Sequence, residues 1–371
     1  MKLSALLKDM DILRNTVSGD PEIGEVRYDS RAVQPGDLFV AIRGYETDGH
    51  KYIPSALEKG AAAVVCEQAD DGVPAVITEN SRRALAIIGA NRFGHPACKL
   101  KMIGVTGTNG KTTTTTLLGE LLKRKRPNAR TAGNIGVPLS EIVREQGDQK
   151  TDVALEVAAF QLVAMEKFHP AVSVCMNLTP DHLDYFGSLD AYYDAKMLVW
   201  KNQTGDDWFL VNLDDPEIVK RCAELPCRRV TFSLDQPADV CVKQDQVWLF
   251  DQPLFALSDL HLPGRHNLQN AMVAAAMAVK LGADADQIRE GIRAFKGVEH
   301  RIEFVAEIRG ARYYNDSKGT NVDATTVALK AFEKPVILLA GGYDKKPGFD
   351  GLKPVLDRVA TMIVYGETRD Q

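Results

Sequence analysis

The sequence predicts an α/β protein built around a parallel sheet that carries a phosphate-binding loop. Short apolar runs of strand length alternate with helix-length stretches along the whole chain. The apolar run 102–105 leads into a glycine-rich loop that ends in Lys111-Thr112, and a helix-like run, 113–123, follows. Four further buried-strand candidates, separated by helix-length segments, favour a mostly parallel sheet with helices on both faces: 153–157, 171–176, 208–212 and 229–233.

Composition narrows the class of protein. The 371 residues, 45% hydrophobic and 26% charged, are typical of a globular chain of two or three domains. The formal charge is −5 and the one basic run, 123–126, ends a predicted helix, so we expect no nucleic-acid partner. No segment reaches the roughly 20 apolar residues that cross a bilayer, and the apolar run near Met1 is too short for a signal peptide. Six cysteines without a CxxC pair indicate reduced thiols, and hence a soluble, cytoplasmic protein.

The N-terminal part, residues 1–98, is expected to be a small α/β domain that ends near Gly94-His95-Pro96. Its predicted strands are 38–42, 61–66 and 75–78. Its predicted helices are 53–59 and 82–92.

The loop from Gly107 to Thr113 has the chemistry of a nucleoside triphosphate site. Glycine lets backbone N–H groups converge on phosphate oxygens at the start of a helix, where the helix dipole also favours anions. Lys111 would add a positive charge, and Thr112 a hydroxyl group for Mg²⁺. Val105 stands where the strict motif has a small residue, so the loop is a variant, and an ordinary glycine-containing turn is the alternative.

Polar groups follow two other strand candidates, where ligands of an open α/β sheet bind. Glu156 is the single carboxylate of a hydrophobic run, which indicates either a Mg²⁺ ligand or an ion pair with a core Lys or Arg. His182 lies between Asp181 and Asp184, and could be a metal ligand, a substrate contact or a structural residue. Lys196, in a predicted helix over 188–200, would by its local sequence alone be a solvated lysine.

The remaining part of the chain predicts one long helix and a third domain. The helix covers 268–281, with Asn267 as its N-cap and Gly282 just past its end. The third domain begins near residue 299, and the polar turn 315–321 could bind a second substrate or simply cap a helix. Its strand candidates are 303–308, 312–314, 336–340 and 361–365, which are too few to cover an open sheet, so we expect an incomplete domain.

These motifs together resemble those of the Mur ligases, ATP-dependent enzymes that form amide bonds in bacterial cell-wall precursors. The resemblance covers essentially the whole chain. It rests on GVTGTNGKT (104–112), GNIG (133–136), EVAAFQL (156–162), NLTPDHLDY (177–185), HNLQNA (266–271), HR (300–301) and NDSK (315–318).

The resemblance implies a three-domain architecture. A UDP-substrate-binding domain would cover 1–98, a central P-loop ATPase domain 99–298, and an incomplete Rossmann-like domain 299–371. The central and C-terminal parts are most similar to the members that add D-glutamate to UDP-N-acetylmuramoyl-L-alanine. The N-terminal part, through DSR (29–31), PGDLF (35–39) and DGH (48–50), resembles the members that add the third residue, lysine or a diamino acid. A natural intermediate, an ancestral sequence and a chimera would each explain this mixture.

The resemblance also implies roles for individual residues, and a monomer that uses ATP and two Mg²⁺ ions. Catalysis would involve Lys111, Glu156, His182 and a carbamylated Lys196. ATP would be bound by Gly107, Thr108, Asn109, Gly110, Lys111, Thr112, Thr113, Asn270, Arg301, Asp316 and Lys318. Metal ligation falls to Thr112, Glu156, His182 and Lys196. The UDP-linked muramoyl peptide would contact Ser30, Asn134 and His182, and the incoming amino acid, with D-glutamate favoured, Thr320 and Lys345.

Two departures from the family pattern leave alternatives open. Ala158 and Ala159 stand where the family has two serines beside the metal ligand, and the chain ends before the residues expected to complete the amino-acid pocket. These departures favour a non-catalytic Mur-like scaffold that binds nucleotide. A folylpolyglutamate-type ligase shares the loop but would lack the 29–39 pattern, and a P-loop motor or kinase would lack 177–185.

Overall fold

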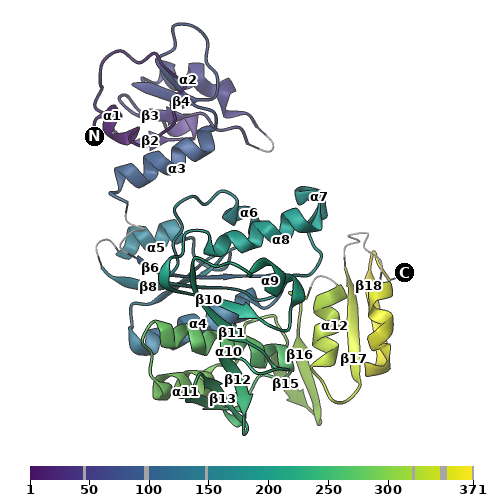
Figure 1. Ribbon diagram of the computed structural model, residues 1–371. Helices are drawn as coiled ribbons and strands as arrows, with labels where there is room; N and C mark the ends of the chain where they lie inside the picture. Colours follow the sequence, from purple (N-terminus) through teal and green to yellow (C-terminus); the bar gives the residue numbers. More distant parts are fainter. Residues whose placement is uncertain (45–46, 96–99, 147–148, 320–321, 343–348, 370–371) are drawn as a thin grey trace. The chain divides into compact units, whose positions relative to one another are not determined.

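The computed structural model describes residues 1–371 except 45–46, 96–99, 147–148, 320–321, 343–348 and 370–371. The chain divides into two compact units, Met1–Lys99 and Leu100–Gln371. Figure 1 shows helices against sheets in each of them. The α/β fold class is therefore confirmed. The further division of the second unit near residue 298 stays a prediction.

The first unit is a five-stranded sheet with the order β1-β5-β4-β3-β2. Strands β2 to β5 run parallel and β1 is antiparallel to β5. The elements are α1 (Leu3–Leu6), β1 (Arg14–Asn15), β2 (Val26–Arg27), η1 (Ser30–Ala32), β3 (Leu38–Val40), η2 (Gly49–Tyr52), α2 (Ile53–Glu58), β4 (Ala63–Cys66), β5 (Ala75–Ile77) and α3 (Ser81–Arg92). Apolar clusters cover both faces of this sheet, and β3 and β4 are therefore buried throughout. All strands and helices predicted for this part are present.

The second unit is built on a nine-stranded sheet with the order β14-β13-β12-β11-β10-β9-β6-β8-β7. Strands β6 to β12 are parallel, and β13 and β14 extend the sheet with antiparallel pairs. The strands are β6 (Leu100–Thr106), β7 (Arg130–Gly133), β8 (Thr151–Glu156), β9 (Val172–Cys175), β10 (Gly205–Asn212), β11 (Cys227–Phe232), β12 (Val240–Lys243), β13 (Gln246–Leu249) and β14 (Gln252–Ala256). The mostly parallel sheet is as expected, but β7 and β12 to β14 were not predicted.

Helices cover both faces of this sheet. One layer consists of α4 (Lys111–Lys125), α10 (Arg265–Lys280) and α11 (Ala285–Ala294). The other consists of α5 (Leu139–Gln146), α6 (Ala159–Leu162), α8 (Leu189–Met197) and α9 (Pro216–Arg221). The short element α7 (Leu183–Phe186) precedes α8, and η4 (Leu198–Trp200) follows it. A third short element, η5 (Leu257–Asp259), lies between β14 and α10. Among the described residues, each helix is too short or too polar to cross a bilayer.

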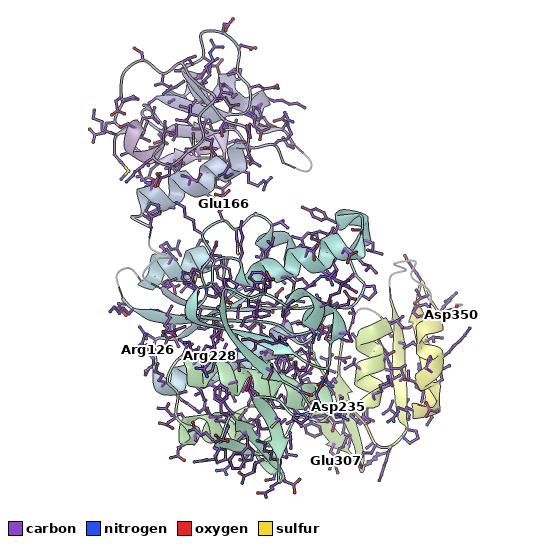
Figure 2. The ribbon with its side chains drawn as sticks, viewed as in Figure 1. Arg126, Glu166, Arg228, Asp235, Glu307 and Asp350 are labelled. Carbon is purple, nitrogen blue, oxygen red and sulfur yellow. The ribbon has the colours of Figure 1, made fainter. Side chains whose placement is uncertain are left out.

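Residues 303–366 form two small sheets. An antiparallel hairpin joins β15 (Glu303–Ile308) to β16 (Ala311–Asn315), with a cross-strand ion pair of 3.2 Å between Arg312 and Glu307. Glu307 is labelled in Figure 2. Strands β17 (Val336–Gly342) and β18 (Val359–Gly366) are parallel, with α12 (Val322–Lys330) and η6 (Asp350–Arg358) packed beside them. Every second residue of β17 is exposed, including Ile337 and Leu339 at 63% and 66%. One face of this two-stranded sheet is therefore apolar and open to solvent.

Two helix predictions need correction. Helix α10 begins at Arg265 after Gly264, whose φ of +94° ends the preceding loop. Asn267 thus lies inside the helix, where its amide donates to the Pro263 carbonyl at 2.7 Å, and it is not the N-cap. The predicted helix over 188–200 is capped by the Ser188 hydroxyl as expected, but its last three residues form a 3₁₀ turn.

Candidate functional site

The glycine-rich loop joins the carboxyl end of β6 to α4. Gly107 and Gly110 have φ values of +137° and +82°, in the region that favours glycine. A Cβ atom at Gly107 would lie 3.0 Å from the Met176 nitrogen, and one at Gly110 only 2.5 Å from the Asn270 side-chain oxygen. The first hydrogen bond of the helix runs from Thr114 N–H to the Gly110 carbonyl at 3.0 Å. The preceding N–H groups therefore point out of the helix start, as a phosphate site requires.

Two lysines converge on this loop. Lys111 Nζ donates to the carbonyls of Gly107 and Thr108 at 2.8 and 2.9 Å. Lys196 Nζ, from α8, donates to the same Gly107 carbonyl at 2.8 Å. Lys196 is 2% exposed, and burial together with the charge of Lys111 lowers its pKa to about 8. Burial also lowers the pKa of Lys111. A solvated surface lysine at position 196 is thereby excluded.

Tyr192 links Lys196 to the loop and to His182, a role that sequence analysis missed. Its ring centroid lies 4.4 Å from Lys196 Nζ, one helical turn away on α8. A hydrogen bond joins its hydroxyl to the Thr108 side chain, although burial still raises the pKa of Tyr192 to about 12. The His182 ring packs edge-on against Tyr192 with centroids 5.8 Å apart. The spacing of Tyr192 and Lys196 by four residues was the available signal.

His182 opens α7 in a left-handed conformation, with φ +51°. Its Nε2 lies 3.6 Å from a carboxylate oxygen of Asp181, and its ring is about half exposed. The ring also stacks edge-on against Phe160 at 4.9 Å. The charge of Asp181 acts on both lysines at the loop, raising the pKa of each against the effect of burial. The structure therefore brings this predicted site residue to the loop.

Glu156 ends β8 beside β6 and is 2% exposed. Its Oε1 accepts a hydrogen bond from the Asn134 amide at 3.1 Å, and the Asn134 N–H donates to the Glu156 carbonyl at 2.9 Å. Among the described residues Oε2 has no hydrogen-bond partner, although it is buried. An amide, and not a core lysine or arginine in hydrogen-bond contact, thus holds the carboxylate. A buried oxygen without a partner fits a cation ligand.

Four further predicted ATP contacts come from outside the loop. Asn270 is buried and accepts a hydrogen bond from the Thr114 hydroxyl at 3.2 Å. The charge of Arg301 contributes to lowering the pKa of Lys111, and within the described part of the chain its buried Nε has no hydrogen-bond partner. Asp316 accepts from the Ile302 N–H at 3.0 Å, and its burial raises its pKa. The Lys318 N–H donates to the His300 carbonyl at 3.0 Å. Thr320 and Lys345 lie outside the described residues.

Ser30 belongs to the first unit, where it is buried in η1. Its carbonyl accepts a hydrogen bond from Lys59 Nζ at 2.9 Å. The preceding Asp29 caps η1 and pairs with Arg31 at 2.8 Å, and this pairing lowers the pKa of Asp29 to about 2. The Asp-Ser-Arg motif is therefore a capped turn that follows β2.

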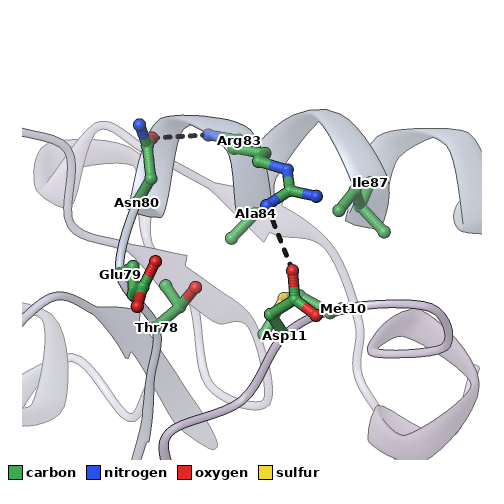
Figure 3. A pocket seen from close by; sticks show the side chains of 8 residues that line it. All are labelled: Met10, Asp11, Thr78, Glu79, Asn80, Arg83, Ala84 and Ile87. Carbon is green, nitrogen blue, oxygen red and sulfur yellow. Dashed lines mark hydrogen bonds and ion pairs between the residues drawn. The ribbon is translucent and has the colours of Figure 1, made fainter. Parts of the chain in front are cut away.

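A separate hollow of about 210 Å³ lies in the first unit next to α3 (Figure 3). An ion pair of 3.1 Å between Arg83 and Asp11 crosses it, and Asn80 caps α3 by accepting from the Arg83 N–H. Its lining residues are Met10, Asp11, Thr78, Glu79, Asn80, Arg83, Ala84 and Ile87. Ser30 is not one of them.

The donor set at the loop fits a metal that retains other ligands. Among the described residues, no three His, Cys, Asp or Glu side chains gather as a closed metal site. Mg²⁺ commonly takes one or two protein oxygens and completes its shell with water and phosphate oxygens. A single buried carboxylate with a free oxygen next to a phosphate loop meets that requirement.

Two family models match parts of this chain. The family model described as "Mur ligase middle domain" matches residues 105–278, and "Mur ligase family, catalytic domain" matches 22–95. UDP-N-acetylmuramoylalanine–D-glutamate ligase of Geobacillus kaustophilus is 40% identical over 292 residues, which are 78% of this chain and 64% of that protein. The ligase of the same name from Shouchella clausii is 36% identical over 92% of this chain and 76% of its own length. The chain thus spans less than two thirds of the Geobacillus protein.

Solved structures show the same fold. MurF from Acinetobacter baumannii has a TM-score of 0.71 and 20% sequence identity, over 98% of this chain and 85% of its own. MurF ligase from Thermotoga maritima in complex with ADP has a TM-score of 0.66 and 22% identity, over 92% and 84%. At these identities the likeness concerns the fold alone.

Proposed function

This chain belongs to the Mur ligase family, and from that premise we propose that it joins D-glutamate to UDP-N-acetylmuramoyl-L-alanine at the expense of ATP. The observation that carries the proposal is the similarity of 36–40% identity to D-glutamate ligases over most of the chain. The phosphate loop, on which Lys111 and the buried Lys196 converge, supports it independently. Such an enzyme of precursor synthesis would act in the cytoplasm.

ATP would bind with its phosphates at the start of α4. The N–H groups of Lys111, Thr112 and Thr113 and the positive end of the helix dipole would meet the phosphate oxygens. Lys111 would release the two loop carbonyls and move its ammonium group to the phosphates. Asn270, Arg301, Asp316 and Lys318 surround the remainder of the nucleotide in this proposal, and the buried Nε of Arg301, which has no hydrogen-bond partner among the described residues, is a ready donor.

Glu156, with its free buried oxygen, Thr112 and His182 would hold Mg²⁺. When bound, Mg²⁺ neutralises phosphate charge and orients the triphosphate for transfer. Asn134 would keep Glu156 in place and contact the muramoyl substrate.

Lys196 is proposed to carry a carbamate. A neutral lysine amine adds to carbon dioxide, forming an N–C bond and releasing a proton. Because the pKa of Lys196 is about 8, a larger fraction of its amine is neutral near pH 7 than for an ordinary lysine. The resulting anion would supply oxygen atoms beside the loop, where Mg²⁺ requires them.

The reaction would proceed in two steps. The carboxylate of the UDP-linked substrate attacks the γ-phosphate of ATP, giving an acyl phosphate and ADP. The amine of the amino acid then attacks the acyl carbon and expels phosphate. Phosphoryl transfer depends mostly on positioning and charge neutralisation, which Lys111 and Arg301 are suited to supply. His182 is the candidate to accept the amine proton. Ser30 would contact the uridine part of the substrate, and Thr320 and Lys345 the amino acid.

The N-terminal motifs favour a second candidate activity, addition of the third residue to UDP-N-acetylmuramoyl-L-alanyl-D-glutamate. Ala158 and Ala159 favour a third candidate, a scaffold that binds nucleotide without turnover. The test measures phosphate release from ATP and Mg²⁺ with UDP-N-acetylmuramoyl-L-alanine, with and without D-glutamate. Release that requires D-glutamate supports the proposal. Release only with the dipeptide substrate and a diamino acid supports the second candidate, and nucleotide binding without release under either condition supports the third.

A further inference from the structure

Asn177 lies where the loop and its neighbouring strand meet. Strand β9 pairs in parallel with β6, with Cys175 opposite Thr106, so the segments that follow both strands leave the same edge of the sheet side by side. Asn177 is the second residue after β9 and is half-buried. The sequence places it 68 residues from Asn109, and the sheet brings the two side by side.

The Asn177 amide makes three hydrogen bonds to the loop backbone. Its Oδ1 accepts from the N–H groups of Thr108 and Asn109 at 3.1 and 2.8 Å. Its Nδ2 donates to the Asn109 carbonyl at 3.1 Å. This pattern needs one acceptor and one donor on a short side chain, which an ionised aspartate and an alanine cannot provide together.

Neighbouring bonds close the same contact. The Thr108 N–H also donates to the Asn177 carbonyl at 3.0 Å. The Thr108 hydroxyl donates to the Thr179 carbonyl at 3.1 Å and accepts from the Thr179 N–H at 3.1 Å. Both the backbone and the side chain of Thr108 are therefore hydrogen-bonded to residues 177–179.

We propose that Asn177 is a positioning residue that divides the loop N–H groups into two sets. Those of Thr108 and Asn109 bind the Asn177 amide and shape the loop. Those of Lys111, Thr112 and Thr113, which precede the first bond of α4, remain for the phosphates. This inference rests on the proposed function, because it assigns which backbone donors of that ATP site contact phosphate.

The wild-type protein tests the division directly, through NMR exchange rates of the loop amides with and without ATP and Mg²⁺. Protected Thr108 and Asn109 amides in the free protein, with new ATP-induced protection at Lys111 to Thr113, are expected. Rapid exchange of the Thr108 and Asn109 amides in the free protein would overturn the proposal. The proposal would also be overturned if the largest ATP-induced increases in amide protection occurred at Thr108 and Asn109.

Variants separate positioning from simple stabilisation. In Asn177→Ala we expect exchange at Thr108 and Asn109 at least about tenfold faster, and a Kd for ATP about tenfold higher, because the two loop N–H groups lose their side-chain acceptor. Asn177→Asp keeps both acceptor bonds, so amide protection persists, but its charge repels phosphate and ATP binding weakens. Asn202→Ala is the matched control, because the Asn202 amide binds two backbone carbonyls, at 2.7 and 2.9 Å, away from the loop.

The two possible failures are distinguishable. ATP binding at wild-type affinity in Asn177→Ala, with a loss of melting temperature like that of Asn202→Ala, would mean a purely structural role for Asn177. Absence of ATP binding to the wild-type protein would refute the proposed function. In that case the amide protection of Thr108 and Asn109 in wild type, and its loss in Asn177→Ala, would still decide whether Asn177 shapes the loop.

Discussion

At the scale of single residues, Lys196 shows a conflict between stability and chemistry. Burial lowers its pKa from 10.5 to about 8, a difference that corresponds to about 3 kcal/mol of unfavourable free energy while the lysine is charged. Below pH 8 it is protonated in both the folded and the unfolded chain, so the penalty is fully present. Between pH 8 and 10.5 the unfolded chain binds more protons, so this contribution to stability improves as pH rises.

Lys196→Met should therefore have a free energy of unfolding about 1–3 kcal/mol higher than that of wild type at pH 7, and should unfold at higher urea concentration. It should also lose ligase activity. The gain should shrink as the pH is raised from 8 to 10. Urea titrations at several pH values measure it, with the exposed Lys201→Met as control. A gain that is independent of pH would show that the charge of Lys196 is not its source.

Glu156→Gln tests the other buried charge at the loop. The amide keeps the shape of the side chain and removes the anion, so we expect at least a hundredfold loss of ATP turnover with little loss of stability. Activity should be measured against Mg²⁺ concentration, with the exposed Glu224→Gln as control. Unchanged Mg²⁺ dependence in Glu156→Gln would exclude this carboxylate as a metal ligand.

At the scale of elements, α6 lacks a side-chain cap. Ala158 holds the N-cap position with extended angles, φ −83° and ψ 155°, but its methyl group accepts no hydrogen bond. The Gln161 side chain accepts from the Ala158 N–H at 2.9 Å, which completes half of a capping arrangement.

Ala158→Ser should therefore stabilise the protein by about 1 kcal/mol, because a serine hydroxyl at this position accepts an N–H of the first turn. Chemical unfolding would detect the change. Ala191→Ser, at an exposed position inside α8, is the control and should cost a few tenths of a kcal/mol. No gain in Ala158→Ser would mean that Gln161 already satisfies the start of α6.

Sequence patterns predicted the elements that have strong local signals. Strands β8 and β9 are buried throughout, β10 contains the apolar run 208–211, and the loop before α4 carries glycine and lysine at fixed spacing. The strands β12 to β14 escaped prediction because they are only four or five residues long, and each begins or ends with glutamine or lysine. Asn267 was assigned as an N-cap because asparagine favours that position, yet the positive φ of Gly264 starts α10 earlier.

The candidate site was predicted less completely, because its contacts join segments distant in sequence. Glu156 and Lys111 follow from strand ends and loop chemistry. Arg301 came only from family resemblance, since one arginine after a loop has no distinctive local pattern. Tyr192 and Asn177 were missed because their partners on the loop are 84 and 69 residues away, a relation that only the sheet order creates.

At the scale of the whole molecule, the exposed apolar face of β17 and β18 should promote self-association. Ile337, Leu339, Ile363 and Tyr365 are each about half exposed or more. Contiguous apolar surface of this kind is uncommon on monomers and is a site for aggregation or docking. Sedimentation velocity should show concentration-dependent oligomers.

The double variant Ile337→Lys, Leu339→Lys should shift the protein toward monomer without unfolding it. Leu338→Lys is the contrasting control, because Leu338 packs against the core of Leu329, Leu352 and Val355 and its replacement should unfold this region. Equal oligomerisation of the double variant and wild type would place the association surface elsewhere.

The Gly107 carbonyl accepts hydrogen bonds from both Lys111 and Lys196. This arrangement affects the free energy of the folded protein before any ligand binds. Two like charges held at one acceptor are locally frustrated, since neither can move away from the other without losing a bond. An anion resolves the conflict by giving the second cation a partner. In the ligand-free protein the repulsion between the two ammonium groups is therefore unfavourable, and an anion that binds at the loop offsets it. The free-energy cost of bringing the two groups together is met when the chain folds, and not each time a ligand binds.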